Sequence, residues 1–294
     1  MTVLSRAPFV APWRVARYDA KEIDGADVVI NLAGRNVDCR YSDENRRAIM
    51  RSRVDSTRWL GAAIAAARTP PRVWLQSSTA TIYAHRHDAP NDERTGIVGG
   101  DEHGAPDVWR FSIDVAQAWE RVTDEVATPL TRKVKMRTAV VMTTAPGGPF
   151  DRLMRLVRRG LGGPVGDGRQ YVSWIHPHDF IRAIEWLIER DDLEGPINIA
   201  APAPLPNRDF MRGMREAGGI RFGLPVPFKW MMEIGAFFLH TESELILKSR
   251  RVVPGRLLES GFRFTFSDWP AAARDLVAST GARVYPDGDS LPYE

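Results

Sequence analysis

Cysteine is almost absent from this sequence, since Cys39 is the only one among 294 residues. A single cysteine excludes an internal disulfide framework. Long hydrophobic runs are missing too: the best candidate, 230–239, is short and contains Glu233, whereas a membrane-spanning helix needs roughly 20 apolar residues. No signal-peptide pattern stands at the start. We therefore expect a cytoplasmic protein with no membrane partner.

Excess charge of either sign is also small, because the formal net charge is only +3. The densest basic stretches, 152–159 and 248–251, interleave with apolar residues at helical spacing. This pattern favours solvated helix faces over a nucleic-acid surface. We expect a small-molecule substrate and no nucleic-acid partner, and the sequence does not indicate an oligomeric state.

Short apolar runs alternate with longer amphipathic stretches, which is typical of strands and crossover helices in a parallel sheet. The expected strands are 27–32, 73–78, 134–142, 172–175 and 197–199, and the expected helices are 42–67, 108–126, 150–159 and 177–189. We expect the first of these strands to be buried. Beyond Pro202 the pattern is mainly helical, so we divide the chain softly into 1–202 and 203–294, two parts that could share one core.

The most specific local signal is the Ser/Thr-rich segment 77–83, at the carboxyl end of a predicted parallel strand, where ligands bind in such sheets. With 31–34 (Asn-Leu-Ala-Gly) and 174–179 (Trp-Ile-His-Pro-His-Asp), it resembles the extended short-chain dehydrogenase/reductase superfamily. The resemblance implies a Rossmann-like doubly wound α/β fold in which the Thr79 hydroxyl bonds the reacting oxygen of the substrate, with Tyr83 nearby. The alternative is a strand-end cluster that only satisfies backbone groups.

The second half narrows the resemblance to one branch of that superfamily. The glycine-rich loop 160–171 and the C-terminal segments 251–254 and 261–264 are similar to a sugar-nucleotide epimerase branch whose substrate is generally unassigned. The similarity covers essentially residues 1–275. It implies hydride transfer on a sugar-nucleotide-like or other small carbonyl or hydroxyl substrate.

The resemblance also implies a cofactor site at the strand ends. Its residues would be Ser5, Arg6, Asn31, Leu32, Ala33, Gly34, Ser77, Ser78, Arg137 and Thr138. Arginine at the end of the second strand accommodates the 2′-phosphate of NADP, whereas an acidic residue there binds the ribose of NAD. Arg6 therefore favours NADP (NADPH) over NAD. Arg6 as an exposed loop residue, and structural roles for Arg137 and Thr138, are the alternatives.

In such a fold, Met1–Arg6 corresponds to the second strand, so the first strand and its glycine-rich turn would be missing. That turn holds the cofactor pyrophosphate on a helix N-terminus. We expect NADP binding to be weakened or lost if the chain truly starts at Met1. Either the true start lies upstream, which we favour, or the protein is a shortened relative.

The usual acid and base of the superfamily are replaced here. The resemblance places Phe111 where a tyrosine would stand and Val115 where a lysine would stand one helical turn later, and neither can transfer a proton. Tyr83, Asp114 or His176 could substitute, although each has a structural explanation. An NAD(P)-dependent epimerase or reductase is the leading hypothesis. The alternative is a non-catalytic nucleotide sensor or interaction scaffold, since some members of the branch are linked by name to cell or plastid division.

No metal site is expected. His85, His87 and His103 lie in what reads as a flexible polar loop, whereas zinc ligands usually sit on ordered turns with a defined surrounding shell. Cys39 has no histidine near it in sequence, and nothing marks it as a nucleophile.

Overall fold

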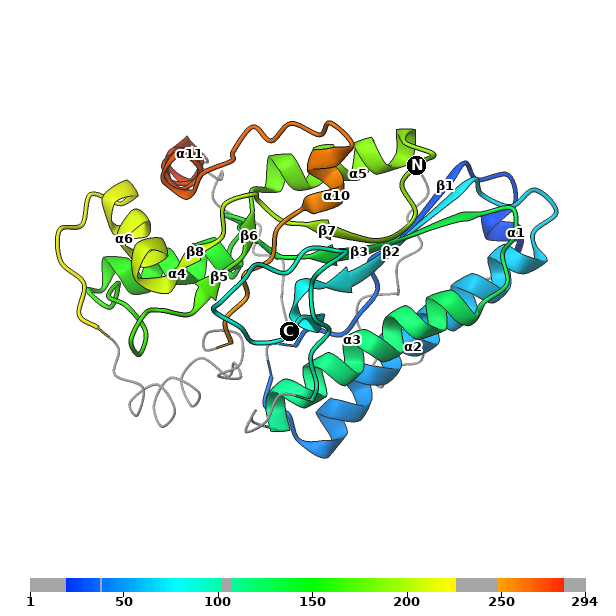
Figure 1. The fold of residues 1–294 in the computed structure, drawn as a ribbon, viewed down its shortest axis with the longest axis horizontal. Coiled ribbons are helices and arrows are strands. Elements are labelled where there is room, and N and C mark those ends of the chain that lie inside the picture. The colour runs from blue at the N-terminus through cyan, green and yellow to red at the C-terminus, as the bar shows by residue number, and fades with distance from the viewer. Residues whose placement is uncertain (1–19, 38, 102–106, 226–247, 283–294) are drawn as a thin grey trace, which may run out of the picture.

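The computed structural model describes residues 20–37, 39–101, 107–225 and 248–282 (Figure 1). The strand expected at Met1–Arg6, and with it Ser5 and Arg6, lies outside these residues, as does His103. None of the described helices is long and apolar enough to cross a membrane.

A four-stranded parallel sheet forms the centre of the molecule. Its order is β1-β2-β3-β7, made by Val28–Asn31, Val73–Thr79, Arg132–Thr138 and Gly195–Ile199. Parallel neighbours need crossover connections, which are usually helices. Helices α2 (Asp43–Ala66) and α3 (Asp107–Glu125) lie together on one face, and α5 (Pro177–Glu189) lies on the other (Figure 1). The predicted Rossmann-like α/β fold is confirmed.

Strand β2 shows why both faces of the sheet are covered. Successive side chains of a strand point to opposite faces. Val73 and Leu75 pack in the cluster that contains Ala183 and Leu187 of α5, whereas Trp74 packs in the cluster that contains Leu60 and Ile64 of α2. All the apolar residues of β2 are therefore buried, as its continuous hydrophobic run predicts.

The expectation that strand 27–32 is buried was wrong in part. Ile30 is 42% exposed and Leu32, just after β1, is 59% exposed, although Asn31 is buried. The reason is that, among the described residues, β1 pairs only with β2. A strand with one neighbour leaves part of its surface open.

Two predicted strands are split in the structure. The segment 134–142 divides into β3 and β4 (Val140–Val141), and 172–175 divides into β5 (Tyr171–Val172) and β6 (Trp174–Ile175). Strand β4 pairs with β6, and β5 pairs with β8 (Leu205–Pro206), forming two small sheets. The pairing of β5 with β8 crosses the soft boundary placed at 202.

The remaining helices contribute to several core clusters. They are α1 (Ala20–Ile23), the short 3₁₀ helix η1 (Ala80–Ile82), α4 (Pro149–Arg158), α6 (Asn207–Ala217), α10 (Gly255–Glu259) and α11 (Trp269–Ala282). Trp269 stacks on Phe210 at 4.1 Å between ring centroids and meets Trp174 edge-on at 4.9 Å. Phe150 belongs to the same cluster. Residues from both sides of position 202 therefore share one core.

Candidate functional site

The strand register brings the predicted segments to one edge of the sheet. Asn31 of β1 lies opposite Gln76 of β2, and Thr79 of β2 lies opposite Thr138 of β3. Because these strands are parallel, their carboxyl ends share the edge where ligands bind in open α/β sheets. The structure thus gathers the described cofactor-site candidates 31–34, 77–78 and 137–138 near Thr79.

The chain leaves β1 through a hydrogen-bonded turn. The Asn31 amide donates from Nδ2 to Gln76 Oε1 at 2.9 Å, and its Oδ1 accepts from the Ala33 N–H at 3.0 Å. Thus a buried asparagine joins two strands and fixes the backbone ahead of Gly34. Leu32 and Gly34 are exposed, so the backbone there can be approached from outside.

Thr79 has a free hydroxyl proton. Its Oγ1 accepts a hydrogen bond from the Thr81 N–H at 3.2 Å and caps η1. No acceptor for the hydroxyl hydrogen is found in the described part of the chain. A threonine hydroxyl both donates and accepts, so half-buried Thr79 can still donate to a ligand oxygen. Neighbouring Ser78 cannot do so, because its hydroxyl donates to Glu120 Oε1 at 2.7 Å.

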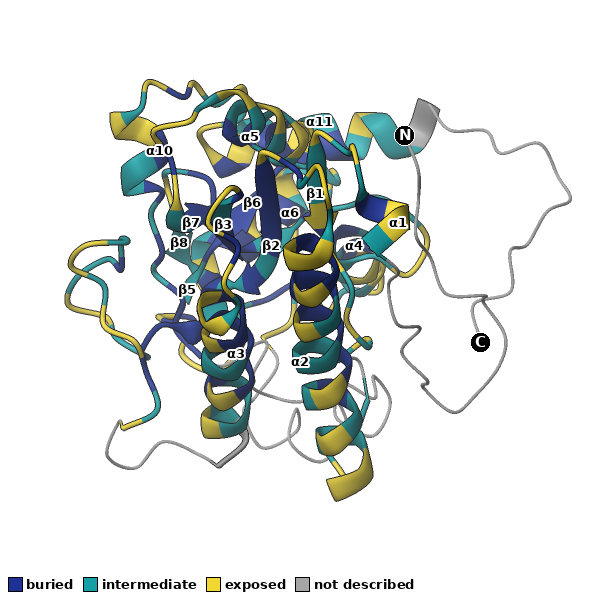
Figure 2. Ribbon diagram, turned by 90° about the vertical axis from the view of Figure 1, so that its right-hand side faces the viewer, coloured by how far each residue is buried: buried dark blue, intermediate teal, exposed yellow. Residues whose placement is uncertain are grey.

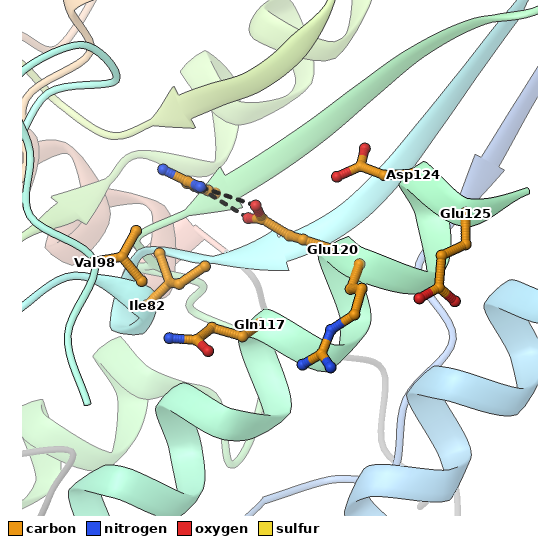
Figure 3. Close-up of a pocket in the computed structure, with 8 residues that line it drawn as sticks. Ile82, Val98, Gln117, Glu120, Asp124 and Glu125 are labelled. Atoms are coloured by element: carbon orange, nitrogen blue, oxygen red, sulfur yellow. Dashed lines mark hydrogen bonds and ion pairs between the residues drawn. The ribbon is translucent and has the colours of Figure 1, made fainter. Parts of the chain in front are cut away.

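A buried ion pair lies directly behind this edge. Arg137 donates from Nε and Nη2 to the two oxygens of Glu120, both at 2.8 Å (Figure 3). Burial opposes the charged form of Arg137, but the hydrogen bonds and charge of Glu120 outweigh it and raise the guanidinium pKa. The predicted cofactor residue Arg137 thus holds protein partners on three of its donors, because Nη1 donates to Tyr83.

Tyr83 belongs to the same network. Its hydroxyl donates to Asn198 Oδ1 at 2.9 Å and accepts from Arg137 Nη1 at 3.0 Å. Only 2% of Tyr83 is exposed, and burial raises the pKa of its hydroxyl. Its one proton is already donated within the protein. This geometry suits positioning better than proton transfer.

His176 is an N-cap. Its Nδ1 accepts from the His178 N–H at 3.1 Å at the start of α5, its Nε2 lies 3.1 Å from Asp275 Oδ2, and its ring stacks on Phe266. Because Nδ1 accepts, the neutral ring carries its proton on Nε2 and donates to Asp275. Burial lowers the pKa of His176 although Asp275 opposes this. These contacts involve none of the other predicted site residues.

Helix α3 carries the two positions where the resemblance places the usual acid and base. Val115 is 5% exposed, and the Phe111 ring meets the Tyr41 ring edge-on at 5.1 Å. Asp114, considered as a substitute, is exposed and has no hydrogen-bond or ion-pair partner among the described residues. Phe111 and Val115 thus offer no proton-transfer group, whereas Asp114 lies on the solvent side of the helix.

The sequence failed to identify a buried lysine that contacts Thr81. Lys248 is 1% exposed, and its Nζ donates to the Thr81 carbonyl oxygen at 2.8 Å. The expectation that 248–251 is a solvated helix face was wrong here, since Ser249 and Arg250 are buried as well. The reason is that long-range partners bind the polar groups of Lys248 and Ser249. The Ser249 hydroxyl, for example, donates to the Arg86 carbonyl. No local pattern signals such contacts.

The sequence analysis also did not identify Glu93 and Asn198, two polar residues of the same network. Glu93 accepts from the Asn198 N–H at 2.7 Å and from the Arg256 N–H at 3.2 Å, and burial raises its pKa. Asn198 in turn donates to the Val253 carbonyl at 2.9 Å. These groups anchor the loop after η1 to β7 and to the segment before α10.

A separate groove of about 500 Å³ runs beside α3 (Figure 3). It is lined by Ile82, Val98, Gln117, Glu120, Arg121, Asp124, Glu125 and Arg137. Of the predicted site residues it contains Arg137 alone, so we do not place the site there. In the described ranges, no group of three His, Cys, Asp or Glu side chains is placed to hold a metal ion.

The parallel sheet, the Thr79 segment at its carboxyl edge and the turn after β1 define an extended short-chain dehydrogenase/reductase. The chain belongs to the epimerase family within that class. It is 30% identical to epimerase family protein YfhF of Bacillus subtilis, over 88% of this chain and 80% of that protein. It is also 28% identical to human epimerase family protein SDR39U1, over 95% of this chain and 91% of that protein.

Solved structures agree. The human SDR39U1 crystal structure with NADPH superposes with a TM-score of 0.77 at 27% identity, covering 88% of this chain and 86% of that one. A nucleoside-diphosphate sugar epimerase from Corynebacterium glutamicum gives 0.67 at 27% identity, with 88% of this chain and 48% of that one covered. Residues 228–276 match the model of a domain of unknown function, DUF1731.

Proposed function

We propose that this protein is an NADP-dependent epimerase or reductase acting on a sugar-nucleotide-like or other small carbonyl or hydroxyl substrate. One observation carries the proposal: Thr79, at the carboxyl edge of the sheet, has a hydroxyl proton with no acceptor in the described part of the chain. The similar human SDR39U1 structure contains NADPH, which supports the cofactor. The soluble nucleotide cofactor also supports a cytoplasmic location.

The cofactor would lie along the ends of β1, β2 and β3. The turn after β1 fits a nucleotide because Gly34 has no side chain and its backbone is exposed. Asn31–Gly34 would border one end of the cofactor, and Ser77, Ser78, Arg137 and Thr138 would flank the other. Arg6 supports NADP over NAD. When bound, this cofactor supplies the hydride donor or acceptor.

The protein's own contribution is to bind and orient. Thr79 would donate to the substrate oxygen that changes oxidation state. Tyr83 holds the side chains of Arg137 and Asn198, and His176 caps α5. With Phe111 and Val115 in place of an acid and base, turnover should be slow. A positioned acid or base contributes about 10² to 10⁴ in rate.

Replacing Thr79 tests the proposal. We expect Thr79→Val to lower the turnover of NADPH with nucleoside-diphosphate keto-sugars at least about tenfold and to leave NADPH affinity within about twofold. Thr143→Val is the matched control, because Thr143 Oγ1 also accepts from a backbone N–H two residues later, from Ala145 at 3.2 Å. Equal turnover in Thr79→Val and wild type would remove Thr79 from the mechanism.

A non-catalytic nucleotide sensor or interaction scaffold is the second candidate. Two observations favour this second candidate. Val115 is buried and cannot transfer a proton, and the Tyr83 hydroxyl already donates its proton to Asn198. This candidate predicts saturable NADPH binding without oxidation of NADPH by any keto-sugar tested. Measurable turnover that Thr79→Val abolishes would exclude it.

A further inference from the structure

The guanidinium group of Arg53, on α2, is fixed by two backbone carbonyls and an aromatic ring. Its Nη1 donates to the carbonyl oxygens of Arg35 at 3.1 Å and Ile49 at 3.2 Å. The guanidinium carbon lies 5.1 Å from the centroid of the Trp119 ring of α3. A guanidinium stacked on an indole and tied to two carbonyls keeps one orientation.

Arg53 has no counter-ion among the described residues. Within the described ranges, no carboxylate lies at ion-pair distance from Arg53, and its remaining donors on Nε and Nη2 have no protein acceptor. Burial lowers the pKa of the Arg53 guanidinium, with the nearby Tyr41 opposing this. Arg53 is half-buried, and because a charge shielded from water is costly without a counter-ion, the arrangement suits an anion from outside.

The guanidinium of Arg53 lies against Gly34, in the turn after β1. A Cβ placed on Gly34 would lie only 3.2 Å from the guanidinium carbon. Gly34 and Arg35 lie three and four residues after the end of β1, and ligands bind at the carboxyl ends of parallel strands. Arg53 therefore lies next to a residue of the predicted site, although no sequence motif marks it.

A second arginine repeats the arrangement two turns earlier on the same face of α2. Arg46 lies 4.9 Å from the centroid of the Phe111 ring, and its Nε donates to the Tyr41 carbonyl at 3.0 Å. It likewise has no carboxylate at ion-pair distance among the described residues. Phe111 and Trp119 stand one turn on either side of Val115. Two guanidinium groups thus bracket the position where the superfamily carries a lysine.

We propose that Arg53, supported by the charge of Arg46, forms an anion-binding site at the carboxyl end of β1 for a phosphate or carboxylate group of a ligand. The planar fork of a guanidinium matches both groups, and such charge-assisted hydrogen bonds are among the strong ones. The anion comes either from the dinucleotide cofactor or from the substrate, for example the diphosphate of a sugar nucleotide. The site itself does not depend on which of them supplies it.

The test compares ligand affinities in charge-removing variants. NADPH, UDP and inorganic pyrophosphate are titrated by calorimetry into wild type, Arg53→Gln and Arg51→Gln. Arg51 is the matched control because it is an exposed arginine of the same helix. We expect Arg53→Gln to weaken at least one probe about 10- to 100-fold and Arg51→Gln to change none by more than about twofold.

The pattern of losses identifies the source of the anion. Loss confined to NADPH assigns it to the cofactor, and loss for UDP or pyrophosphate assigns it to a substrate diphosphate. Unchanged affinity for all three probes in Arg53→Gln, or no binding of any probe to wild type, overturns the site. If wild type binds UDP or pyrophosphate through Arg53 but not NADPH, the proposed function fails and the site stands.

Arg53→Lys guards against a variant that does not fold. Lysine retains the charge and the aliphatic stem but loses the planar fork. Its fold is checked by thermal unfolding against Arg51→Gln. We expect Arg53→Lys to bind the affected probe with an affinity between those of wild type and Arg53→Gln. If Arg53→Gln is unfolded, we expect Arg53→Lys to bind that probe about fivefold more weakly than wild type. Wild-type affinity for every probe in folded Arg53→Lys, with Arg53→Gln unfolded, overturns the site.

Discussion

Arg137 and Glu120 form a two-point ion pair with both side chains at most 10% exposed. The pair joins the end of β3 to the middle of α3, so it fixes the helix that carries Phe111 and Val115 against the sheet (Figure 2). Charge on both partners is needed, because each side chain is too deeply buried to be well solvated alone.

Glu120→Gln should therefore lower the free energy of unfolding by about 3 to 5 kcal/mol, since it leaves the Arg137 charge buried and uncompensated. Urea unfolding followed by circular dichroism measures this. Asp192→Asn is the control: Asp192 is 59% exposed and pairs with Arg190 on the surface, where such pairs contribute about 0 to 1 kcal/mol. Similar losses in the two variants would contradict a special role for the buried pair.

Tyr83→Phe separates positioning from proton transfer. The variant removes the hydroxyl between Arg137 Nη1 and Asn198 Oδ1. We expect a loss of about 1 to 3 kcal/mol in unfolding free energy from the unpaired buried groups, and turnover within about twofold of wild type. Steady-state kinetics on the folded variant checks this. A hundredfold fall in turnover would instead make Tyr83 the acid or base.

His176 should make the protein less stable at mildly acid pH. Burial lowers its pKa from the ordinary value of 6.5, so below about pH 6.5 the unfolded chain binds a proton that the folded chain resists. The stability that the neutral His176 side chain contributes to the folded protein is therefore present above pH 6.5 and is lost as pH falls through the folded pKa. His176→Asn keeps an N-cap acceptor but does not titrate. Urea unfolding at pH 7.5 and 5 should show a steeper loss in wild type, and parallel losses would refute it.

Gly213→Ala should destabilise the protein although it lies within a helix. Alanine usually stabilises a helix interior by about 1 kcal/mol over glycine. Here, however, a Cβ would meet Trp269 Cδ1 at 2.8 Å, and Trp269 is 1% exposed and stacked on Phe210. Overpacking of this kind costs about 1 to 3 kcal/mol. Thermal unfolding decides the sign: an increase in Tm would mean that Trp269 yields easily.

Local pattern predicted the elements of this fold well. The helix expected at 177–189 is α5 to the residue, and the helix expected from Ser42 is α2 with Ser42 as its N-cap. Proline at a helix start and a capping serine are signals written within a few neighbouring residues. The strand run 73–78 is equally local.

The side-chain network could not be predicted, because its partners lie far apart in sequence. Tyr83 meets Asn198 across 115 positions, and Lys248 meets Thr81 across 167. In the sequence, nothing distinguishes Arg53 from the other arginines of its helix. Only the packing of α3 against α2 places the Trp119 ring next to it. Such contacts depend on how helices and strands pack, which no short motif records.

The central claim is that the carboxyl edge beside Thr79 binds NADP, and a fluorescence titration of the protein with NADPH tests it most directly. We predict saturable enhancement of NADPH fluorescence, displacement by NADP, and displacement by NAD only at concentrations at least about tenfold higher. The absence of any saturable signal from folded protein at millimolar NADPH would contradict the account.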